Sequence, residues 1–328
     1  MNVLITSASK KVWLVKAFQR ALAHEGGGVV YAIDISPNAP ALYFADKHSL
    51  CLKDSDPAFI SSLLSLCKSN QISLIIPTRD EELPIFSKVR DNFQTAGIYI
   101  MTASSSTINI CQDKKMFIAF CNQHGFNTPT TYNAAITNNT PDKIDFPLFI
   151  KPTRGKGGAN TAKINSLNEL KMFISISGDD HIIQKYIDAP EYTVDLFSDL
   201  SGNVISVVPR VRIMVFGGES YVSKTQSDQK IITESTRLAQ KLNLIGHNTI
   251  QCFLENGRVL FIEVNPRYGG GAALGIEAGA DTPRYMIKLL KGDTLSPDKN
   301  NFTDNFYMLR YTSELYMKET ELYTDKAK

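Results

Sequence analysis

The sequence predicts a mixed protein of the α/β and α+β classes, in which a doubly wound parallel sheet precedes a part that contains antiparallel hairpins. In the first hundred residues, short apolar strand patterns alternate with amphipathic helix patterns, which favours parallel strands joined by helices. Further along, the apolar runs Thr249–Leu254 and Val259–Ile262 flank Glu255-Asn256-Gly257-Arg258, a hairpin signal. A chain of 328 residues is long enough for two or three domains.

The elements of the first part follow from apolar runs of strand length and from longer runs with a helical period. They are the strands Val3–Thr6, Val29–Ile33, Leu74–Ile76 and Ile98–Met101, and the helices Val12–Ala23 and Phe59–Cys67. The turn after the first strand, Ser7-Ala8-Ser9-Lys10-Lys11, lacks the glycines that let a backbone approach a dinucleotide pyrophosphate. This absence disfavours a nucleotide-binding dehydrogenase, in which Asp34 would bind the ribose.

The elements of the later part are separated by glycine, proline and Ser/Thr-rich stretches. They comprise a linker at Thr102–Thr107, helices at Met116–His124, Ala272–Gly279 and Arg284–Lys291, a strand pair at Val208–Ile213 and Phe216–Tyr221, and a terminal strand at Tyr307–Tyr316.

Composition narrows the class of protein further. The 35 basic and 33 acidic residues give almost no net field, which does not suggest a nucleic-acid partner. No apolar run is long enough to span a membrane, and the start Met1–Thr6 lacks the longer apolar core of a signal peptide. The five cysteines are scattered without a metal-ligand or disulfide pattern, so we expect reduced thiols in a cytoplasmic protein.

The stretch Glu263-Val264-Asn265-Pro266-Arg267 combines hard oxygen ligands with a fixed positive charge at the end of a strand. Glu263 and Asn265 are two residues apart, so on an extended chain they project to the same face. A carboxylate and an amide oxygen are the ligands that Mg²⁺ takes when it also bridges phosphates. Arg267 adds a planar fork suited to phosphate or carboxylate. The alternative interpretation is an edge strand with a surface acid followed by a turn.

The register of the hairpin decides whether Gln251 can join this set. A two-residue Asn256-Gly257 turn would pair Gln251 with Ile262 and place Glu263 on the opposite face. A three-residue loop, with Gly257 left-handed, would pair Gln251 with Phe261 and bring Glu263 to its face, one diagonal step away. The metal-site interpretation therefore predicts the three-residue loop.

The residues Gln251, Glu263, Asn265 and Arg267 together resemble the metal-and-phosphate motif of the ATP-grasp ligases, in the version typical of the large subunit of carbamoyl phosphate synthetase. The resemblance extends from about Met1 to Gly292. It implies an ATP-grasp fold preceded by a Rossmann-like pre-ATP-grasp domain, with ATP as the nucleotide and Mg²⁺ (or Mn²⁺) as the metal. The domains expected on this basis are 1–105, the pre-ATP-grasp domain; 106–182, linker helices and lid; 183–300, the catalytic subdomain; and 301–328, a C-terminal tail.

A strand-end lysine, Lys151, stands just before the glycine-rich, basic loop Thr153–Ala159. The N–H groups and cations of such a loop can wrap a polyphosphate, and its glycines allow it to close as a lid. The order Lys-Pro-x-x-Gly-x-Gly-Gly is typical of the ATP-grasp lid, which here contains Gly155, Gly157 and Gly158. The resemblance also implies that Lys114, at the start of a helix, contacts phosphate. An exposed loop and a surface lysine are the alternatives.

The resemblance further implies an adenine site along the segment Gln184-Lys185-Tyr186-Ile187, with Glu191 reaching the ribose hydroxyls. Related enzymes often have an acid where this chain has Gln184. Because an amide can either accept or donate a hydrogen bond, this departure leaves the detail of that contact open.

Residues for the second substrate are expected from three places. Arg79, Asp80 and Glu81, at the carboxyl end of a strand, would face the substrate cleft by resemblance, or would simply begin a helix. Arg210 and Arg212 alternate with apolar residues and project to one face, which overlooks either the metal or solvent. The glycine turn around Gly270 precedes a helix and could receive an anion.

Together these parts predict an ATP-dependent carboxylate–amine ligase that acts through an acyl phosphate and forms an amide or peptide bond, with release of ADP and phosphate. Arg267, Lys151 and Arg212 would act in catalysis, and the partners would be a small-molecule carboxylate and an amine. Carbamoyl-phosphate-synthetase-like phosphorylation of a carboxylate or carbamate, and a non-catalytic ATP-binding module, are the alternatives. The assembly is left open, with a homodimer as the form considered.

Overall fold

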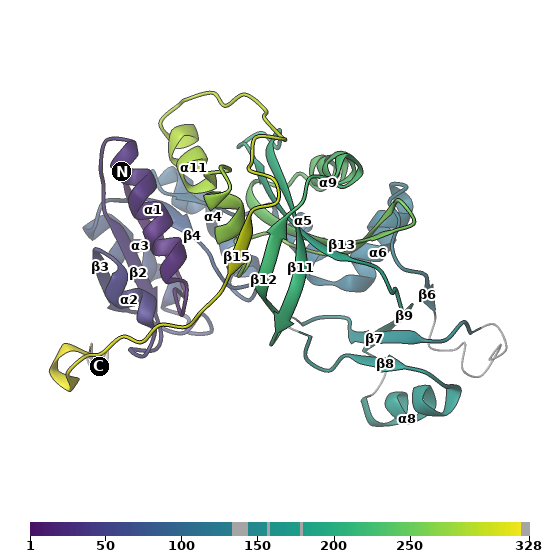
Figure 1. Ribbon diagram of the computed structural model, residues 1–328. Coiled ribbons are helices and arrows are strands. Elements are labelled where there is room, and N and C mark those ends of the chain that lie inside the picture. The colour runs from purple at the N-terminus through teal and green to yellow at the C-terminus, as the bar shows by residue number, and fades with distance from the viewer. Residues whose placement is uncertain (133–143, 156–157, 178–179, 323–328) are drawn as a thin grey trace.

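The computed structural model describes residues 1–132, 144–155, 158–177 and 180–322, and these residues form three sheets. Figure 1 shows the N-terminal parallel sheet with its helices at one end of the molecule and a smaller sheet with helix α8 at the other, with a long antiparallel sheet between them. The mixed fold expected from the sequence is confirmed.

The N-terminal sheet is wholly parallel and has the strand order β3-β2-β1-β4-β5. Its strands are β1 (Asn2–Ile5), β2 (Val30–Asp34), β3 (Lys47–Leu50), β4 (Ile72–Ile76) and β5 (Tyr99–Ile100). Its helices are α1 (Val12–His24), α2 (Pro40–Phe44), α3 (Phe59–Ser69) and α4 (Leu83–Thr95). The inner strands β1, β2 and β4 are buried because helices cover both faces, so they form near-continuous apolar runs, whereas the edge strand β3 is polar and only partly buried. The short elements α2 and β3, and the polar helix α4, were not foreseen.

The connection out of this sheet is helical where a linker was expected. Ser104 caps α5 (Ser105–Gln112) by accepting a hydrogen bond from Thr107 N at 3.2 Å. Asp113 caps α6 (Lys114–Gln123) in the same way. The expected linker is therefore correct for residues 102–104 and wrong for residues 105–107, because a serine-rich stretch supplies a helix cap as readily as a loop.

The central sheet is antiparallel, with the strand order β14-β13-β10-β11-β12-β15. Its strands are β10 (Glu191–Ser198), β11 (Val204–Phe216), β12 (Glu219–Thr225), β13 (Gly246–Glu255), β14 (Arg258–Asn265) and β15 (Tyr307–Leu309). The amphipathic helix α9 (Gln229–Leu242) buries one face against this sheet through Ile231, Leu238 and Leu242. The C-terminal part thus adds a strand to the central sheet, although β15 is shorter than the strand expected.

The third sheet has the order β6-β9-β7-β8 and carries α8 (Leu167–Ser177). Its strands are β6 (Thr131–Tyr132), β7 (Leu148–Pro152), β8 (Ala162–Ile164) and β9 (His181–Lys185). Three short elements complete the chain: α10 (Ala273–Glu277), α11 (Thr282–Leu290) and the 3₁₀ turn Glu319–Glu321. Among the residues described, no helix is long and apolar enough to cross a membrane.

Candidate functional site

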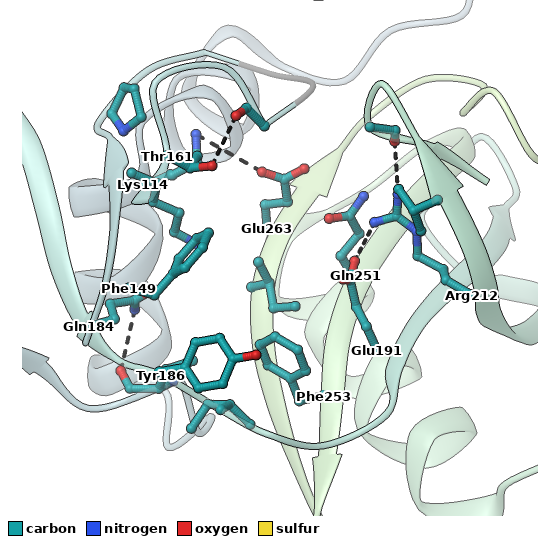
Figure 2. A pocket seen from close by; sticks show the side chains of 18 of the residues that line it. Lys114, Phe149, Thr161, Gln184, Tyr186, Glu191, Arg212, Gln251, Phe253 and Glu263 are labelled. Atoms are coloured by element: carbon teal, nitrogen blue, oxygen red, sulfur yellow. Dashed lines mark hydrogen bonds and ion pairs between the residues drawn. The ribbon is translucent and has the colours of Figure 1, made fainter. Parts of the chain in front are cut away.

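A pocket of about 670 Å³ lies between the third sheet and the central sheet, a size usual for a small-molecule site. Figure 2 shows side chains from both sheets pointing into it. Twelve residues expected from the sequence line it: Lys114, Lys151, Gly155, Gly158, Gln184, Lys185, Tyr186, Ile187, Glu191, Arg212, Gln251 and Glu263. Gly157 and Lys156 of the expected lid lie outside the described residues.

The β13–β14 hairpin brings Gln251 and Glu263 together by a route that differs from the prediction. Glu255 pairs with Arg258, so the turn has two residues, Asn256 and Gly257, both with positive φ (50° and 72°). The predicted three-residue loop is therefore wrong, because Asn-Gly is the favoured sequence for a tight two-residue turn. Further along the hairpin a β-bulge shifts the register.

The bulge inserts one extra residue, Ile262, into β14. Cys252 pairs with Phe261, and the next pair is Gln251 with Glu263. A bulge of this kind exchanges the faces of all residues beyond it, so Glu263 lies directly opposite Gln251 and on the same face. The common face predicted for the two side chains is correct, and its cause is the bulge.

The oxygen ligands expected for a metal are Glu263, Gln251 and Asn265. Asn265 Nδ2 donates to Glu263 Oε1 at 3.2 Å, and Asn265 lies beside the pocket without lining it. Within the described ranges, no cluster of three or more His, Cys, Asp or Glu side chains is arranged to hold a metal. One carboxylate with amide oxygens fits Mg²⁺ that keeps waters and is shared with phosphates, since Mg²⁺ is seldom bound by a protein cage alone.

Two buried lysines, Lys114 and Lys151, line the same pocket, and Figure 2 shows Lys114 across from Glu263. Lys114 Nζ donates to Gly155 O at 3.0 Å and lies 4.0 Å from Glu263 Oε2. Lys151 is 7% exposed, and burial lowers its pKa to about 8, although the Glu263 carboxylate acts in the opposite direction. Glu191 also acts on Lys151 but is paired with Arg212, so the two lysines leave an excess of positive charge, which a polyphosphate would neutralise.

An apolar part of the pocket is formed by Phe149 on β7 with Phe253 and Ile262 on the central sheet. Sequence reasoning missed these residues, although a signal existed. Phe149 is two residues before Lys151, and Phe253 is two residues after Gln251, so strand alternation places each on the face of a predicted site residue. Ile262 carried no such signal because it is the bulge residue.

Two backbone N–H groups of the predicted adenine segment already form hydrogen bonds within the fold. Lys185 N donates to Thr130 O at 2.8 Å, and Tyr186 N donates to Pro147 O at 3.0 Å, so these two N–H groups are not available to a base. Lys185 Nζ is drawn outward by Asp145, whose Oδ2 lies at 2.6 Å. Gln184, Tyr186 and Ile187 line the pocket.

The two arginines of β11 have different surroundings. Arg212 lines the pocket, forms an ion pair with Glu191, and donates to Ser220 Oγ at 3.2 Å and to Gly218 O at 2.8 Å. Arg210 is 1% exposed and is held by Asp195 through bonds of 2.6 and 3.1 Å. The expected substrate contact of Arg210 is not supported, because its guanidinium is enclosed behind the glycine turn, where a Cβ on Gly271 would approach it to 2.6 Å.

Arg267 is clamped by the N-terminal domain. Its Nε and Nη2 atoms lie 2.7 and 2.5 Å from the two carboxylate oxygens of Asp80, which follows β4. Arg79, by contrast, pairs with Glu81 at 3.2 Å, and neither lines the pocket. Asp80 is thus the residue of the loop Arg79–Glu81 that contacts Arg267. The sequence could not show this contact, which joins residues 187 positions apart.

The glycine turn at Gly270 precedes a helix of five residues, too short to supply the anion site that was expected there. Gly270 O instead accepts a hydrogen bond from Arg310, which also pairs with Glu219. Arg310 follows β15 in the part of the chain that showed no motif. Gly270 does not line the pocket.

A parallel-sheet domain followed by two antiparallel sheets around a pocket with two lysines and a strand-end Glu-x-Asn defines the class of ATP-grasp proteins. Residues 3–101 match the model of the PylC-like N-terminal domain, and residues 111–271 match that of the ATP-grasp domain. The chain thus contains a PylC-like N-terminal domain followed by an ATP-grasp domain.

Comparison with individual proteins agrees with this assignment. The chain is 30% identical over 190 residues to the carbamoyl phosphate synthase large chain of Thermoanaerobacter sp. (strain X514), an alignment that covers 52% of this chain and 17% of that protein. The chain thus spans about a sixth of this relative's length.

Solved structures with the same fold include the biotin carboxylase β-γ-ATP complex from Campylobacter jejuni, with a TM-score of 0.73, 17% identity, and coverage of 93% of this chain and 74% of that one. The N5-carboxyaminoimidazole synthetase of Staphylococcus aureus, complexed with ADP, has a TM-score of 0.69 and 16% identity, with coverage of 90% and 78%.

Proposed function

We propose that this protein is an ATP-dependent carboxylate–amine ligase. The observation that carries the proposal is the convergence of Lys114, Lys151, Gln251 and Glu263 on one pocket with an apolar end. Such a pocket offers an aromatic and aliphatic site for a nucleobase and a cationic site for a polyphosphate. The ADP and ATP-analogue complexes of the structural neighbours support a nucleotide in the same role here.

We assign each residue of the site a role from its position. Phe149, Phe253 and Ile262 would hold the base, and Glu191 would reach the ribose. Lys114 and Lys151, with Gly155 and Gly158, would bind the phosphates. Gln251, Glu263 and Asn265 would hold Mg²⁺ (or Mn²⁺), which supplies Lewis-acid stabilisation of the phosphate oxygens when it is bound. These groups exclude water from the phosphates and keep positive charge where negative charge grows.

The reaction proposed has two steps. A carboxylate oxygen of the first substrate attacks the γ-phosphorus of ATP, the bond to the β-phosphate oxygen breaks, and ADP leaves. The nitrogen of an amine then attacks the acyl carbon, phosphate leaves, and the amine loses a proton as an amide or peptide bond forms. Arg267, held by Asp80, would stabilise the oxygen on which charge grows, and Arg212, which lines the pocket, would support the transfer. All of this is positioning and electrostatics.

A second candidate is phosphorylation of a small carboxylate or of carbamate without amide formation, which is favoured by the sequence likeness to a carbamoyl phosphate synthase large chain. The chain spans only 17% of that relative, so the activity of the whole relative is not transferred. The five free cysteines, four of them buried, suit a reducing compartment, and we propose a cytoplasmic enzyme, with a homodimer as a candidate assembly.

The test is ADP release in the presence of Mg·ATP and pools of carboxylates, with hydroxylamine as a substitute amine. Hydroxylamine converts an acyl phosphate into a hydroxamate, which is measured directly. We expect carboxylate-dependent ADP and hydroxamate in equal amounts, and loss of both in Glu263→Ala. Mg²⁺-dependent binding of ATP with no carboxylate-dependent ADP from any pool would instead indicate a non-catalytic ATP-binding module.

A further inference from the structure

The turn that follows Arg267 lies directly on polar side chains of the central sheet, and two of its glycines have no room for a Cβ. An added Cβ at Gly269 would lie 2.7 Å from Thr249 Oγ1, on β13. At Gly271 it would lie 2.6, 3.0 and 3.1 Å from three atoms of the Arg210 guanidinium, on β11. Favourable contact between nonbonded atoms begins at roughly 3.5–4.0 Å, so the turn is in close contact with the sheet at both positions.

The guanidinium beside Gly271 is enclosed and paired, so it cannot easily move aside. Arg210 is 1% exposed, and its Nε and Nη2 donate to Asp195 at 2.6 and 3.1 Å. Asp195 is confined in turn, because a Cβ at Gly275 of α10 would lie 2.9 Å from its Oδ2. A two-bond contact between an arginine and a carboxylate fixes the orientation of both groups. The buried ion pair is therefore a rigid surface beneath the turn.

The position of the turn affects Arg267 through two backbone carbonyl groups. Asp80 binds Nε and Nη2 of Arg267, and the remaining nitrogen, Nη1, donates to Tyr268 O at 3.1 Å. Thr249 Oγ1 donates to the carbonyl oxygen of Arg267 itself at 3.3 Å. The carbonyl group of Tyr268 belongs to the peptide bond with Gly269. Displacement of the turn would therefore move the oxygen that holds Arg267 Nη1.

We propose that Arg210 and Asp195 are positioning residues for the proposed ligase reaction. Their buried ion pair holds the turn in the place from which Tyr268 O orients the guanidinium of Arg267. This inference rests on the proposed function and adds two residues that do not line the pocket. Misplacement of a catalytic group by about 1 Å can lower a rate by about 100-fold, so a turn displaced by one methyl group should slow turnover.

The experiment compares Gly271→Ala with Gly270→Ala as a matched control. Turnover is measured as carboxylate-dependent ADP and hydroxamate at saturating Mg·ATP, with pools of carboxylates and with hydroxylamine as the amine. Neither glycine has a positive φ, and a Cβ at Gly270 would meet its nearest atom, in Glu219, at 3.7 Å, an ordinary contact. In Gly271→Ala we expect turnover to fall by about tenfold or more, with the dissociation constant of ADP within about twofold of the wild type. In Gly270→Ala we expect both quantities to stay within about twofold.

Arg210→Lys provides a second test, since it keeps the charge opposite Asp195 but removes the guanidinium atoms beside Gly271. In the Arg210→Lys background, Gly271→Ala should lower turnover by less than about threefold, because the two substitutions act on one contact and their effects are not additive. A role in stability alone would lower the midpoint of urea unfolding but leave the turnover of the folded variants unchanged.

Equal turnover in Gly271→Ala and the wild type, or additive effects in the double variant, overturns the positioning role and leaves the proposed function standing. Absence of carboxylate-dependent ADP and hydroxamate in the wild type overturns both. Where Gly271→Ala does not fold, Arg210→Lys alone is the test. Its turnover should fall by about threefold or more with the affinity for ADP retained, and unchanged turnover overturns the positioning role.

Discussion

The nucleotide pocket and the region around Arg267 differ in how far their positive charges are balanced by acidic side chains. In the pocket, Glu263 is the main carboxylate that faces Lys114 and Lys151, and Glu191 is already paired with Arg212, so positive charge is in excess. Around Arg267, Asp80 occupies the guanidinium fork. The arginines expected at the second-substrate side also have acidic partners: Arg79 with Glu81, Arg210 with Asp195, and Arg212 with Glu191. Arg310, which was not expected there, is paired with Glu219.

This difference teaches how each region would meet a ligand. In a pocket with an excess of positive charge, binding of the first anion is favourable because the anion relieves the repulsion between buried cations. Around Arg267 the arginines are already paired with acidic side chains. Binding of an anion there is favourable only if the anion replaces the acidic partner or binds to the ion pair as it stands. We therefore expect substitutions in the pocket to change nucleotide affinity, and substitutions around Arg267 to change turnover or the second substrate.

The largest effect is expected from Glu263→Ala, which removes the carboxylate that lies 4.0 Å from Lys114 and acts most strongly on Lys151. The loss of a Mg²⁺ ligand should lower ATP-dependent turnover by about 100-fold or more, since loss of even an outer partner of a metal costs roughly 10- to 100-fold. Nucleotide affinity should no longer depend on Mg²⁺, measured by calorimetry with and without the ion. Glu255→Gln, on the same hairpin but at its turn, is the control and should behave as the wild type. Retention of the Mg²⁺ dependence in Glu263→Ala would show that the metal site lies elsewhere.

Arg267→Lys should have the next largest effect and would separate the two regions most clearly. Lysine keeps the charge but cannot form the two-bond contact with Asp80, so turnover at saturating ATP should fall by roughly 10- to 100-fold. The dissociation constant of ATP should stay nearly unchanged. Steady-state kinetics and calorimetry on the same preparation give both quantities, and Arg258→Lys controls for a loss of arginine from the hairpin. A parallel loss of ATP affinity with turnover spared would assign Arg267 to the wrong step.

The pH dependence of nucleotide binding should report Lys151. Burial lowers the pKa of Lys151 from its ordinary value of 10.5 to about 8, so the side chain is charged below pH 8 and neutral above it. Phosphate binding favours the charged form, and affinity for ADP should therefore be constant below about pH 7 and should fall about tenfold between pH 7 and pH 9.

Lys151→Arg provides the control for this effect, because arginine stays protonated throughout the range. Its ADP affinity should be lower overall but flat between pH 7 and pH 9. A wild-type affinity that is equally flat over this range would contradict the excess of positive charge assigned to the pocket.

The smallest effect is expected from Arg310→Met, which tests whether the C-terminal part supports the second-substrate side. Removal of the hydrogen bond to Gly270 O loosens the glycine turn after Arg267, so the KM for the second substrate should rise by about threefold, the size of effect expected for one hydrogen bond at the surface. The affinity for ADP should not change. A drop in ADP affinity would instead show that the two regions do not act separately on the nucleotide and the second substrate.

Much of the pocket could be predicted because it is made of local patterns. Glu263 and Asn265 share a face by strand alternation, Lys151 ends an apolar strand before a glycine-rich loop, and these positions depend only on neighbours in the chain. The same alternation contains Phe149 and Phe253, so the apolar end was within reach of the sequence. The ion pairs around Arg267 could not be predicted in this way. The bond between Arg267 and Asp80 joins two domains, and nothing local to either residue selects its partner.

The hairpin shows the boundary between the two sources of information. Asn256-Gly257 by itself determines a tight two-residue turn, because both residues accept positive φ at low cost. That turn alone would have placed Glu263 on the face opposite Gln251. Only the tertiary structure decides otherwise: β14 is an edge strand, and Phe261 N donates to Asn127 O at 2.8 Å, outside the sheet, at the point where the bulge begins. The chain determined which chemical groups are present on each strand, whereas a contact from a distant segment decided which of them meet, because register beyond a bulge depends on what pairs with the free edge.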